Sequence, residues 1–241
     1  MIQTHPWFMR IFDNHPFSLK GLVFICFFLC LMLAPVFSPV HATSDLSEKS
    51  SMSGLFGSHE TMSRQLVAFK KWNDMLARQH EDLKKKPVSD ETCRKTAEQK
   101  CYRKVWLELL DFLKDKPPAR QIAEINLYMN KAPYITDMIN WGVSDYWASL
   151  RQFFKKDGDC EDYAIAKYMS LKKLGFDVDN MRIVVVQDTN LDIPHAVLVV
   201  SIGKDRLILD NQISYVAKEK AVLHYRPYYS INEKAWWLHR M

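Results

Sequence analysis

The chain has 241 residues and a mass of 28.3 kDa, and 48% of its residues are hydrophobic, 25% charged and 12% aromatic. This composition is too apolar for an intrinsically disordered protein, and 7 glycines, 10 prolines and 5 cysteines exclude collagen-like and disulfide-dense chains. The net charge is +5, from 33 Lys and Arg against 28 Asp and Glu, without dense basic blocks. We therefore expect a globular protein that has no nucleic-acid partner.

The N-terminal residues have the pattern of an export signal. The apolar run 21–35 is shorter than the roughly 20 residues that a membrane-spanning helix needs, and a cleavage-like triplet ends at Ala42. Residues 1–42 are therefore predicted to be a signal peptide, with an uncleaved inner-membrane anchor as the alternative. The small and polar residues 43–57 are predicted to form a flexible lead-in.

Three helices are predicted next, from apolar residues that recur at helical spacing and from prolines that end two of them. They are expected over residues 62–86, from about residue 89 to residue 116, and over residues 119–129. If Cys93 and Cys101 lie in one continuous helix, they are roughly 12 Å apart, too far for a disulfide, which tolerates about 7 Å. Either the second helix begins nearer Cys101 or these thiols stay reduced.

The sequence pattern changes after Pro133. A helix is predicted from Cys160 to a stop signal at Gly175. Runs rich in β-branched residues predict strands over 182–187, 195–202 and 206–210. A turn at Gly203-Lys204 joins the last two strands as a hairpin. Helices followed by antiparallel strands indicate the α+β class.

Cys160 is the first candidate for chemistry. The residues after it carry a helical apolar stripe, so the sequence predicts that Cys160 lies in the first turn of a helix. The unpaired N–H groups and the helix dipole favour a thiolate there, and the N–H of Cys160 itself points where an oxyanion would form. The alternative interpretation is a small buried residue at a helix start.

His195 opens a predicted strand and Asp210 closes the next one. The two-residue turn pairs residue 210 with Val197, which shares a face with His195, so Asp210 is predicted to be a diagonal neighbour within side-chain reach. A histidine oriented by an aspartate and presented to a helix-start cysteine is the arrangement of nucleophile, base and orienter. A strand-end histidine and a turn-forming aspartate are the alternatives, and another turn register would separate the pair.

Four acids surround the cysteine: Asp157, Asp159, Glu161 and Asp162. Carboxylates suit a helix N-terminus, so capping alone is one interpretation. Negative charge beside a thiolate raises the thiol pKa, however, and a bound hard cation would remove that conflict. Because Ca²⁺ prefers clustered carboxylate and carbonyl oxygens, the sequence predicts a local calcium site that holds the nucleophile loop.

Several segments together resemble the bacterial transglutaminase-like cysteine proteinases, and more narrowly the LapG-type periplasmic proteases. They are Trp141-Gly142, Asp145-Tyr146-Trp147, GDCEDYAIAKYMSLKKLGF (158–176), HAVLVV (195–200), LILDN (207–211) and YSINEKAWWLHR (229–240). The resemblance implies a papain/transglutaminase-like α+β fold, in which helices pack on a catalytic helix and an antiparallel sheet. Residues 119–241 would form the protease core and residues 58–118 its helical N-terminal part.

The same resemblance implies roles for the site residues. Cys160 would be the nucleophile, His195 the general base and acid, and Asp210 the orienter. Calcium would be bound by Asp159 and Glu161, with Asp162 as a further candidate ligand.

A substrate, a partner and a location are also implied. The substrate would be a large surface adhesin, cleaved in its N-terminal region near paired alanines, which releases it and disperses the biofilm. An inner-membrane receptor that senses cyclic-di-GMP would sequester the protease when the nucleotide is abundant. The expected location is the periplasm.

Three other functions fit the same residues. A transglutaminase-type acyl transferase uses the same triad, and a cell-wall peptidase differs in its substrate. A non-catalytic periplasmic binding module keeps the fold but does not need the thiol. Incorporation of a labelled amine, digestion of peptidoglycan and replacement of Cys160 separate these alternatives.

Overall fold

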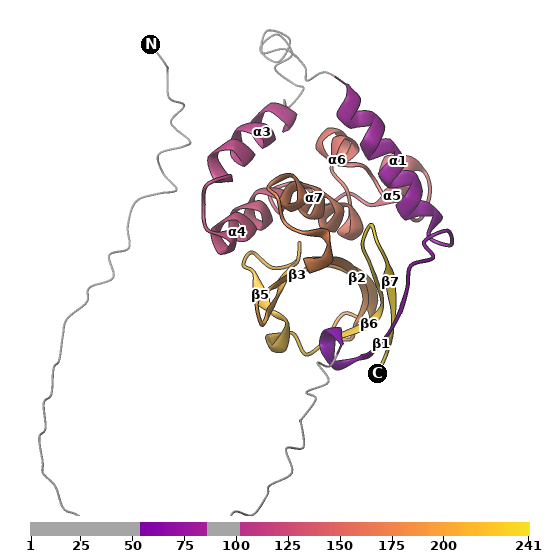
Figure 1. The fold of residues 1–241 in the computed structure, drawn as a ribbon. Coiled ribbons are helices and arrows are strands. Elements are labelled where there is room, and N and C mark those ends of the chain that lie inside the picture. Colours follow the sequence, from indigo (N-terminus) through magenta and orange to yellow (C-terminus); the bar gives the residue numbers. More distant parts are fainter. Residues whose placement is uncertain (1–53, 86–101) are drawn as a thin grey trace, which may run out of the picture. The chain divides into compact units, whose positions relative to one another are not determined.

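Figure 1 shows the computed structural model, which describes residues 54–85 and 102–241. All of these residues belong to one unit, Ser50–Met241. The predicted signal peptide, the predicted start of the second helix, and Cys93 and Cys101 lie outside the described residues.

The strands of the described residues form one antiparallel sheet in the order β1-β7-β6-β2-β3-β4-β5. In chain order they are β1 (His59–Ser63), β2 (Met181–Asp188), β3 (Ile193–Ile202), β4 (Asp205–Leu209), β5 (Ala217–Lys218), β6 (Tyr225–Ile231) and β7 (Trp236–Arg240). The sheet is strongly curved, and β1 lies along β7 at its edge (Figure 1). Strand pairing therefore joins the beginning of the described chain to its C-terminal strand.

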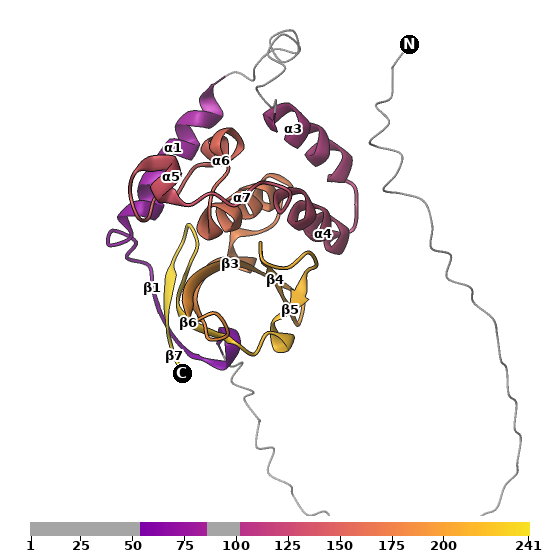
Figure 2. The ribbon, with the colours of Figure 1, turned by 180° about the vertical axis from the view of Figure 1, so that it is seen from behind.

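The α-helices of the described residues gather on one side of this sheet (Figures 1 and 2). They are α1 (Lys70–Lys84), α3 (Tyr102–Leu113), α4 (Pro118–Met129), α5 (Asp137–Trp141), α6 (Leu150–Lys156) and α7 (Cys160–Lys173). The short 3₁₀ helices are η1 (Leu55–Gly57), η2 (Val178–Asn180) and η3 (Glu219–Ala221). Helix α7 packs on β2 and β3 and also against α4 and α6. Its residues 162–171 are consequently all buried, as is typical of a helix in the centre of a core.

Two apolar clusters pack against the sheet, one on each of its faces. Side chains alternate along a strand, so Ile183 belongs to the large cluster under the helices while Val184 belongs to a smaller cluster on the opposite face. Leu55 of η1 covers that smaller cluster and is only 3% exposed. Both faces of the central strands are therefore shielded from water.

The predicted α+β class is confirmed, and so are several elements. The helix expected over 119–129 is α4, with Pro118 in its first turn, and the three predicted strands are β2, β3 and β4. The hairpin register is also as predicted, because Ile202 pairs with Asp205 across the two-residue turn. Gly203 has a φ of 58° in that turn, which explains the glycine.

Two predictions near the N-terminus are wrong. The helix expected from Met62 begins at Lys70, because residues 59–63 form β1 and Met62 pairs with Trp237. The spacing of apolar residues near Met62 cannot predict this pairing, because the partner strand lies at the other end of the chain. The lead-in expected to be flexible up to residue 57 is ordered in its last part, where η1 forms and Leu55 is buried.

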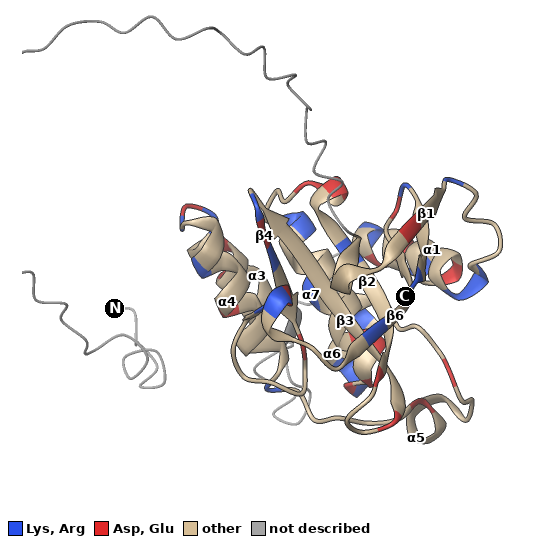
Figure 3. Cartoon of the chain, turned by 90° about the horizontal axis from the view of Figure 1, so that it is seen from below, with Lys and Arg blue, Asp and Glu red and all other residues tan. Residues whose placement is uncertain are grey.

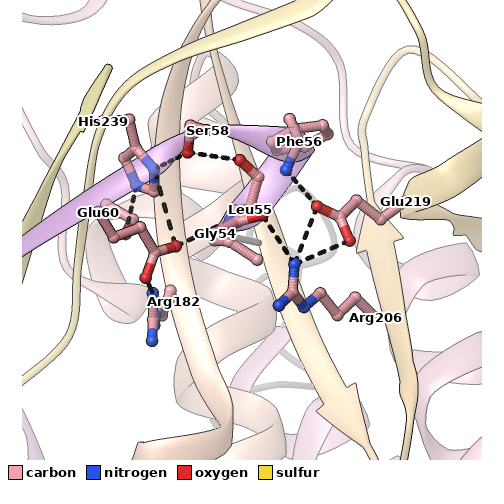
Figure 4. Close-up of polar contacts among 10 residues, drawn as sticks. Gly54, Leu55, Phe56, Ser58, Glu60, Arg182, Arg206, Glu219 and His239 are labelled. Carbon is pink, nitrogen blue, oxygen red and sulfur yellow. Dashed lines mark hydrogen bonds and ion pairs between the residues drawn. The ribbon is translucent and has the colours of Figure 1, made fainter. Parts of the chain in front are cut away.

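Polar contacts tie the N-terminal strap, residues 54–63, to one side of the sheet (Figure 4). Glu60 accepts hydrogen bonds from Nη1 of Arg182 at 2.9 Å and from the backbone N of Leu55 at 2.8 Å. Ser58 Oγ and His239 Nδ1 are 2.7 Å apart, and both side chains are buried. The strap is thus joined to β2 by the ion pair of Glu60 with Arg182, and to β7 by the Ser58–His239 hydrogen bond and by strand pairing.

A second set of contacts holds the other end of the strap (Figure 4). Nη1 of Arg206 donates to the backbone O of Gly54 at 2.9 Å and pairs with Glu219 at 3.3 Å. Glu219 also accepts from the backbone N of Phe56. These contacts join η1 to β4 and η3 on the face of the sheet opposite the helices.

Charged residues of both signs are spread over the elements. Figure 3 shows positions of Lys and Arg and positions of Asp and Glu interspersed over the helices, strands and loops. Within residues 54–85 and 102–241, no helix combines the length and the apolar character that crossing a bilayer requires.

Candidate active site

Cys160 is the first residue of α7, and the turn after α6 sets its position. The N-cap residue Asp159 is extended, and the backbone O of Gly158 accepts from the N of Ile135 at 2.9 Å. A Cβ added at Gly158 would lie 2.6 Å from the Cβ of Asp162, so the turn requires glycine. The prediction that Cys160 lies in the first helical turn is confirmed.

His195 and Asp210 form a buried pair where β3 begins and β4 has just ended, and each side chain is 2% exposed. Nε2 of His195 donates to Oδ1 of Asp210 at 2.9 Å, which is the diagonal contact that the hairpin register predicts. The hydroxyl of Tyr225 donates to Oδ2 of Asp210 at 2.5 Å, and the backbone N of Gln212 donates to Oδ1 at 2.9 Å. Burial raises the pKa of Asp210, but these donors outweigh burial and hold the pKa below its usual value.

Cys160 approaches this pair from α7, which packs on β3. The N–H of Ala196, the residue after His195, faces Sγ of Cys160 and favours its thiolate. Because His195 engages Asp210 through Nε2, Nδ1 is the ring nitrogen left to exchange a proton with the thiol. The structure thus brings the three sequence-predicted residues to one end of the contact between α7 and β3.

The environment of Cys160 keeps its thiol protonated. Burial raises the pKa of the thiol most, and the negative charges of Glu161 and Asp159 raise it further. Sγ donates to Oε2 of Glu161 at 3.2 Å. The thiol proton is therefore drawn towards a carboxylate for as long as the charge of these acids is uncompensated.

Five carboxylates gather beside the thiol in two groups that share Asp137. One group is Asp137, Asp145 and Glu161, and the other is Asp137, Asp159 and Asp162. Within each group, one oxygen from each residue lies within 4.8 Å of the others. All three sequence-predicted ligands are therefore present, divided between the two groups.

The second group has a common hydrogen-bond pattern, in which one oxygen of each aspartate accepts from a backbone N–H. Oδ2 of Asp137 accepts from Tyr146, Oδ2 of Asp159 accepts from Asp137 at 3.1 Å, and Oδ1 of Asp162 accepts from Ala148 at 2.7 Å. The other oxygen of each carboxylate is buried without a partner among the described residues. Each carboxylate is thus oriented by the backbone and keeps one oxygen for a ligand.

Burial dominates the electrostatics of this acidic cluster. It raises the pKa of Asp137 to about 6 and that of Glu161 to about 9, and it raises the pKa of Asp162 well above its usual value. Repulsion from Asp159 adds to all three shifts. Buried, unpartnered carboxylate oxygens at this spacing fit a hard divalent cation such as Ca²⁺.

Sequence reasoning missed Asp137 and Asp145. Asp137 is the first residue of the short helix α5, and its signal is that of an ordinary helix-start acid after Thr136. Nothing local indicates that the segment from α5 to α6 folds back onto the start of α7. That approach depends on hydrogen bonds between Asp137 and Asp159 and between Ala148 and Asp162.

Residues 82–239 match the family of bacterial transglutaminase-like cysteine proteinases (BTLCP). The chain belongs to this family. Its members are cysteine proteinases, so the protein is assigned to that class of enzyme, and the matched range contains Cys160, His195 and Asp210.

Three solved structures of LapG from Legionella pneumophila are similar to this proteinase. The calcium-bound structure is 34% identical with a TM-score of 0.54, covering 63% of this chain and 88% of that one. A second LapG structure is 35% identical, with a TM-score of 0.53 and the same coverage. The EGTA-treated structure is 34% identical with a TM-score of 0.54, covering 64% and 87%. These similarities confirm the predicted transglutaminase-like fold.

The comparison with curated proteins gives no match.

Proposed function

We propose that this proteinase is a calcium-dependent periplasmic endopeptidase of the LapG type, with Cys160 as nucleophile, His195 as general base and acid, and Asp210 as orienter. One observation carries the proposal. A buried imidazole–carboxylate hydrogen bond of 2.9 Å lies beside a cysteine that begins the central helix. This is the arrangement that activates a thiol for attack on a carbonyl carbon.

The proposed reaction has two steps. Nδ1 of His195 takes the thiol proton, Sγ of Cys160 forms a bond to the carbonyl carbon of the scissile peptide, and the N–H of Cys160 donates to the resulting oxyanion. The imidazolium then gives its proton to the leaving amine, which departs and leaves a thioester. His195 deprotonates a water that attacks the thioester, and the carboxylic acid product leaves as the thiol regains its proton.

The start of α7 supports the assignment of the oxyanion donor. Asp159 is the N-cap residue but makes no side-chain hydrogen bond to its own helix. It accepts from the backbone N of Asp137 instead. The side chain of Asp159 therefore leaves the N–H of Cys160 to face a substrate oxygen, while the N–H of Asp162 donates to the backbone O of Asp159 at 3.1 Å.

We assign the calcium site to the acidic cluster of Asp137, Asp145, Asp159, Glu161 and Asp162. The support is the set of unpartnered buried oxygens on Asp137, Asp159 and Asp162, together with the calcium-bound and EGTA-treated states of the similar LapG structures. A bound cation would neutralise the carboxylates that raise the thiol pKa and would release the thiol from Glu161.

The proposed substrate is the N-terminal region of a large surface adhesin, cut near paired alanines so that the adhesin is released and the biofilm disperses. Small side chains at the cut require a narrow entrance. Trp141 and Tyr146 stack with ring centroids 4.4 Å apart on the segment that supplies Asp137 and Asp145 to the acidic cluster, which suits such an entrance. Trp147 is buried against Trp72 and contributes to the core instead. An inner-membrane cyclic-di-GMP receptor is the proposed partner that sequesters the protease.

Mass spectrometry of proteins shed from the cell surface tests the function. Cells that carry the wild-type protein are compared with cells that carry Cys160→Ala, and with cells that carry Ser201→Ala at the other end of β3 as a matched control. The proposal expects one new N-terminus, next to small residues in a surface adhesin, that disappears only in Cys160→Ala cells.

The same experiment in ¹⁸O-labelled water separates hydrolysis from acyl transfer. Hydrolysis places ¹⁸O in the new C-terminal carboxylate, whereas transfer attaches an amine at that carbon. Shed proteins that are identical in wild-type and Cys160→Ala cells would overturn the proposed function.

A further inference from the structure

Phe56 of the N-terminal strap has a backbone conformation that bulky residues seldom adopt. Its φ is 53° and its ψ is 32°, which lie in the left-handed region, inside the short helix η1. Such a conformation is strained and persists only where the surrounding structure enforces it. A strained aromatic residue at this place therefore calls for a reason beyond the covering of the sheet.

Polar contacts from β4 and η3 hold Phe56 in this conformation (Figure 4). The backbone N of Phe56 donates to Oε1 of Glu219, and Oε2 of Glu219 pairs with Nη1 of Arg206 at 3.3 Å. Nη1 of Arg206 also donates to the backbone O of Gly54 at 2.9 Å, and the backbone N of Gly57 donates to the same oxygen at 3.2 Å. These contacts clamp η1, and the direction in which the Phe56 side chain leaves the backbone is fixed as a result.

The ring of Phe56 meets the ring of Tyr225, the first residue of β6. Their centroids are 6.0 Å apart and their planes are at 74°, which is the edge-to-face arrangement that aromatic pairs favour. Tyr225 is buried, and its hydroxyl donates to Oδ2 of Asp210 at 2.5 Å. Its ring also lies beside the ring of His195, with 5.8 Å between the centroids. Tyr225 thus contacts Phe56 on one side and both members of the buried imidazole–carboxylate pair on the other.

The strand register explains why these side chains share one face of the sheet. Strand β2 lies between β3 and β6. Val186 of β2 pairs with His195 of β3. Two residues further on, Asp188 of β2 pairs with Tyr225 of β6, so both partners point to the same face. Phe56 packs on the smaller apolar cluster of this face, which contains Tyr225. The strap is therefore connected to the buried pair by a chain of direct contacts.

We propose that Phe56 is a positioning residue of the protease site, whose clamped ring holds the Tyr225 hydroxyl on Asp210 and so keeps His195 in its productive orientation. The inference rests on the proposed roles of Asp210 and His195 and adds the strap to them. When the ring is removed, the Tyr225 side chain gains freedom and its hydrogen bond to Asp210 weakens. Asp210 then holds the Nε2 proton of His195 less firmly.

Hydrogen exchange at His195 tests this coupling in the full, folded protein without any substrate. The protein is labelled with ¹⁵N-histidine, and NMR in calcium measures the rate at which the Nε2 proton of His195 exchanges with water. Phe56→Gly removes the ring at a φ that suits glycine, so the turn is expected to persist while exchange becomes about tenfold faster. Phe56→Tyr keeps the ring and is expected to keep the wild-type rate.

Glu60→Gln is the matched control in the same strap. It removes the ion pair of Glu60 with Arg182 at 2.9 Å but keeps a side-chain oxygen that can accept from the backbone N of Leu55. The control is expected to lower the thermal midpoint and to leave the exchange rate at His195 unchanged, because the ring contact between Phe56 and Tyr225 remains.

A double-mutant cycle separates positioning from a general loss of stability. Tyr225→Phe already removes the hydroxyl, so Phe56→Gly in that background is expected to change the exchange rate by less than about twofold. Independent effects that multiply in the double variant would overturn the inference. An unchanged rate in Phe56→Gly, or the same acceleration in Glu60→Gln, would overturn it as well.

Phe56→Leu covers the case in which Phe56→Gly does not fold, since it keeps an apolar side chain over the cluster but loses the aromatic edge. Exchange is expected to be at least about threefold faster in this variant, and a wild-type rate would overturn the inference. If the coupling is found but Cys160→Ala leaves shedding intact, the inference stands and the proposed function fails.

Discussion

The backbone N–H of Asp137 donates to Oδ2 of Asp159 at 3.1 Å and so joins the start of α5 to the N-cap of α7. Through this bond the acidic cluster and the nucleophile turn are one structural unit. A cation bound to the cluster would therefore act on the position of Cys160 as well as on the charge around it.

Asp137 belongs to both carboxylate groups, so its charge should matter most for cation binding. Asp137→Asn keeps the backbone donor and one side-chain oxygen but removes the charge. We expect calcium affinity, measured by isothermal titration calorimetry, to fall at least about tenfold. Asp111→Asn, an exposed change on α3, is the control with unchanged affinity. Equal affinities for wild type and Asp137→Asn would contradict the assigned site.

Calcium is expected to reverse the pH dependence of stability near neutrality. Without it, the raised pKa values of Asp137 and Glu161 mean that the folded state binds more protons than the unfolded state. The free energy of unfolding that these two groups contribute is therefore greatest below about pH 4. It is lost as the pH rises through about 6, where Asp137 ionises, and through about 9, where Glu161 ionises. The difference between thermal midpoints in calcium and in EGTA should therefore widen from about pH 5 to 8. A difference between the two thermal midpoints that stays constant with pH would contradict the assignment of the acidic cluster as the calcium site.

Gly158→Ala tests how closely the nucleophile turn packs on the acidic cluster. The added Cβ collides with the carboxylate and the Cβ of Asp162, so we expect a loss of about 1–3 kcal/mol in unfolding free energy together with weaker calcium binding. Gly175→Ala is the control: its Cβ meets nothing within 4 Å, and only backbone strain at a φ of 97° is added. It should lower stability but not calcium affinity. Unchanged calcium binding in Gly158→Ala would show that the turn and the cluster are independent.

Tyr225→Phe removes the hydroxyl that donates to Oδ2 of Asp210. The carboxylate loses a stabilising donor, so its pKa should rise and His195 should be oriented less firmly. We expect kcat to fall about tenfold with little change in KM, in line with the worth of a hydrogen bond to a charged group. Tyr228→Phe, on the same strand but with an exposed hydroxyl bonded to Gln187, should have wild-type kinetics. A similar fall in kcat in both variants would contradict the role of the Tyr225 hydroxyl and would indicate a general disturbance of β6.

His239 should make the N-terminal strap sensitive to acid. Burial lowers its pKa to about 4, so the unfolded state takes up a proton first as pH falls below about 6.5. The stability that neutral His239 supports is complete above about 6.5 and is lost as pH falls towards 4. In saturating calcium, the chemical-denaturation free energy of His239→Gln should therefore change less than that of wild type over this range. If the unfolding free energies of His239→Gln and wild type depend on pH with the same slope, His239 is excluded as the group that makes the strap sensitive to acid.

Sequence reasoning predicted the centre of the protein because the signals there are local. The β-branched runs and the Gly203 turn define β2, β3 and β4, and the two-residue turn fixes the register that places Asp210 beside His195. The start of α7 at Cys160 follows from its apolar stripe and from the acids before it. These predictions depend on residues close together in the chain.

The missed features all depend on pairing between distant segments. Met62 has helical neighbours in sequence, yet it forms a strand because β7 offers an open edge. Asp137 and Asp145 become part of the acidic cluster only because the segment that carries them folds back against the nucleophile turn.

The most direct test of the central claim is the rate at which Cys160 is alkylated by iodoacetamide at about pH 7, because only the thiolate reacts. In calcium the acidic cluster no longer opposes ionisation and His195 accepts the proton, so the account predicts alkylation at least about tenfold faster in calcium than in EGTA. It also predicts slow alkylation in His195→Ala under both conditions. A rate that is the same in calcium, in EGTA and in His195→Ala would contradict the account.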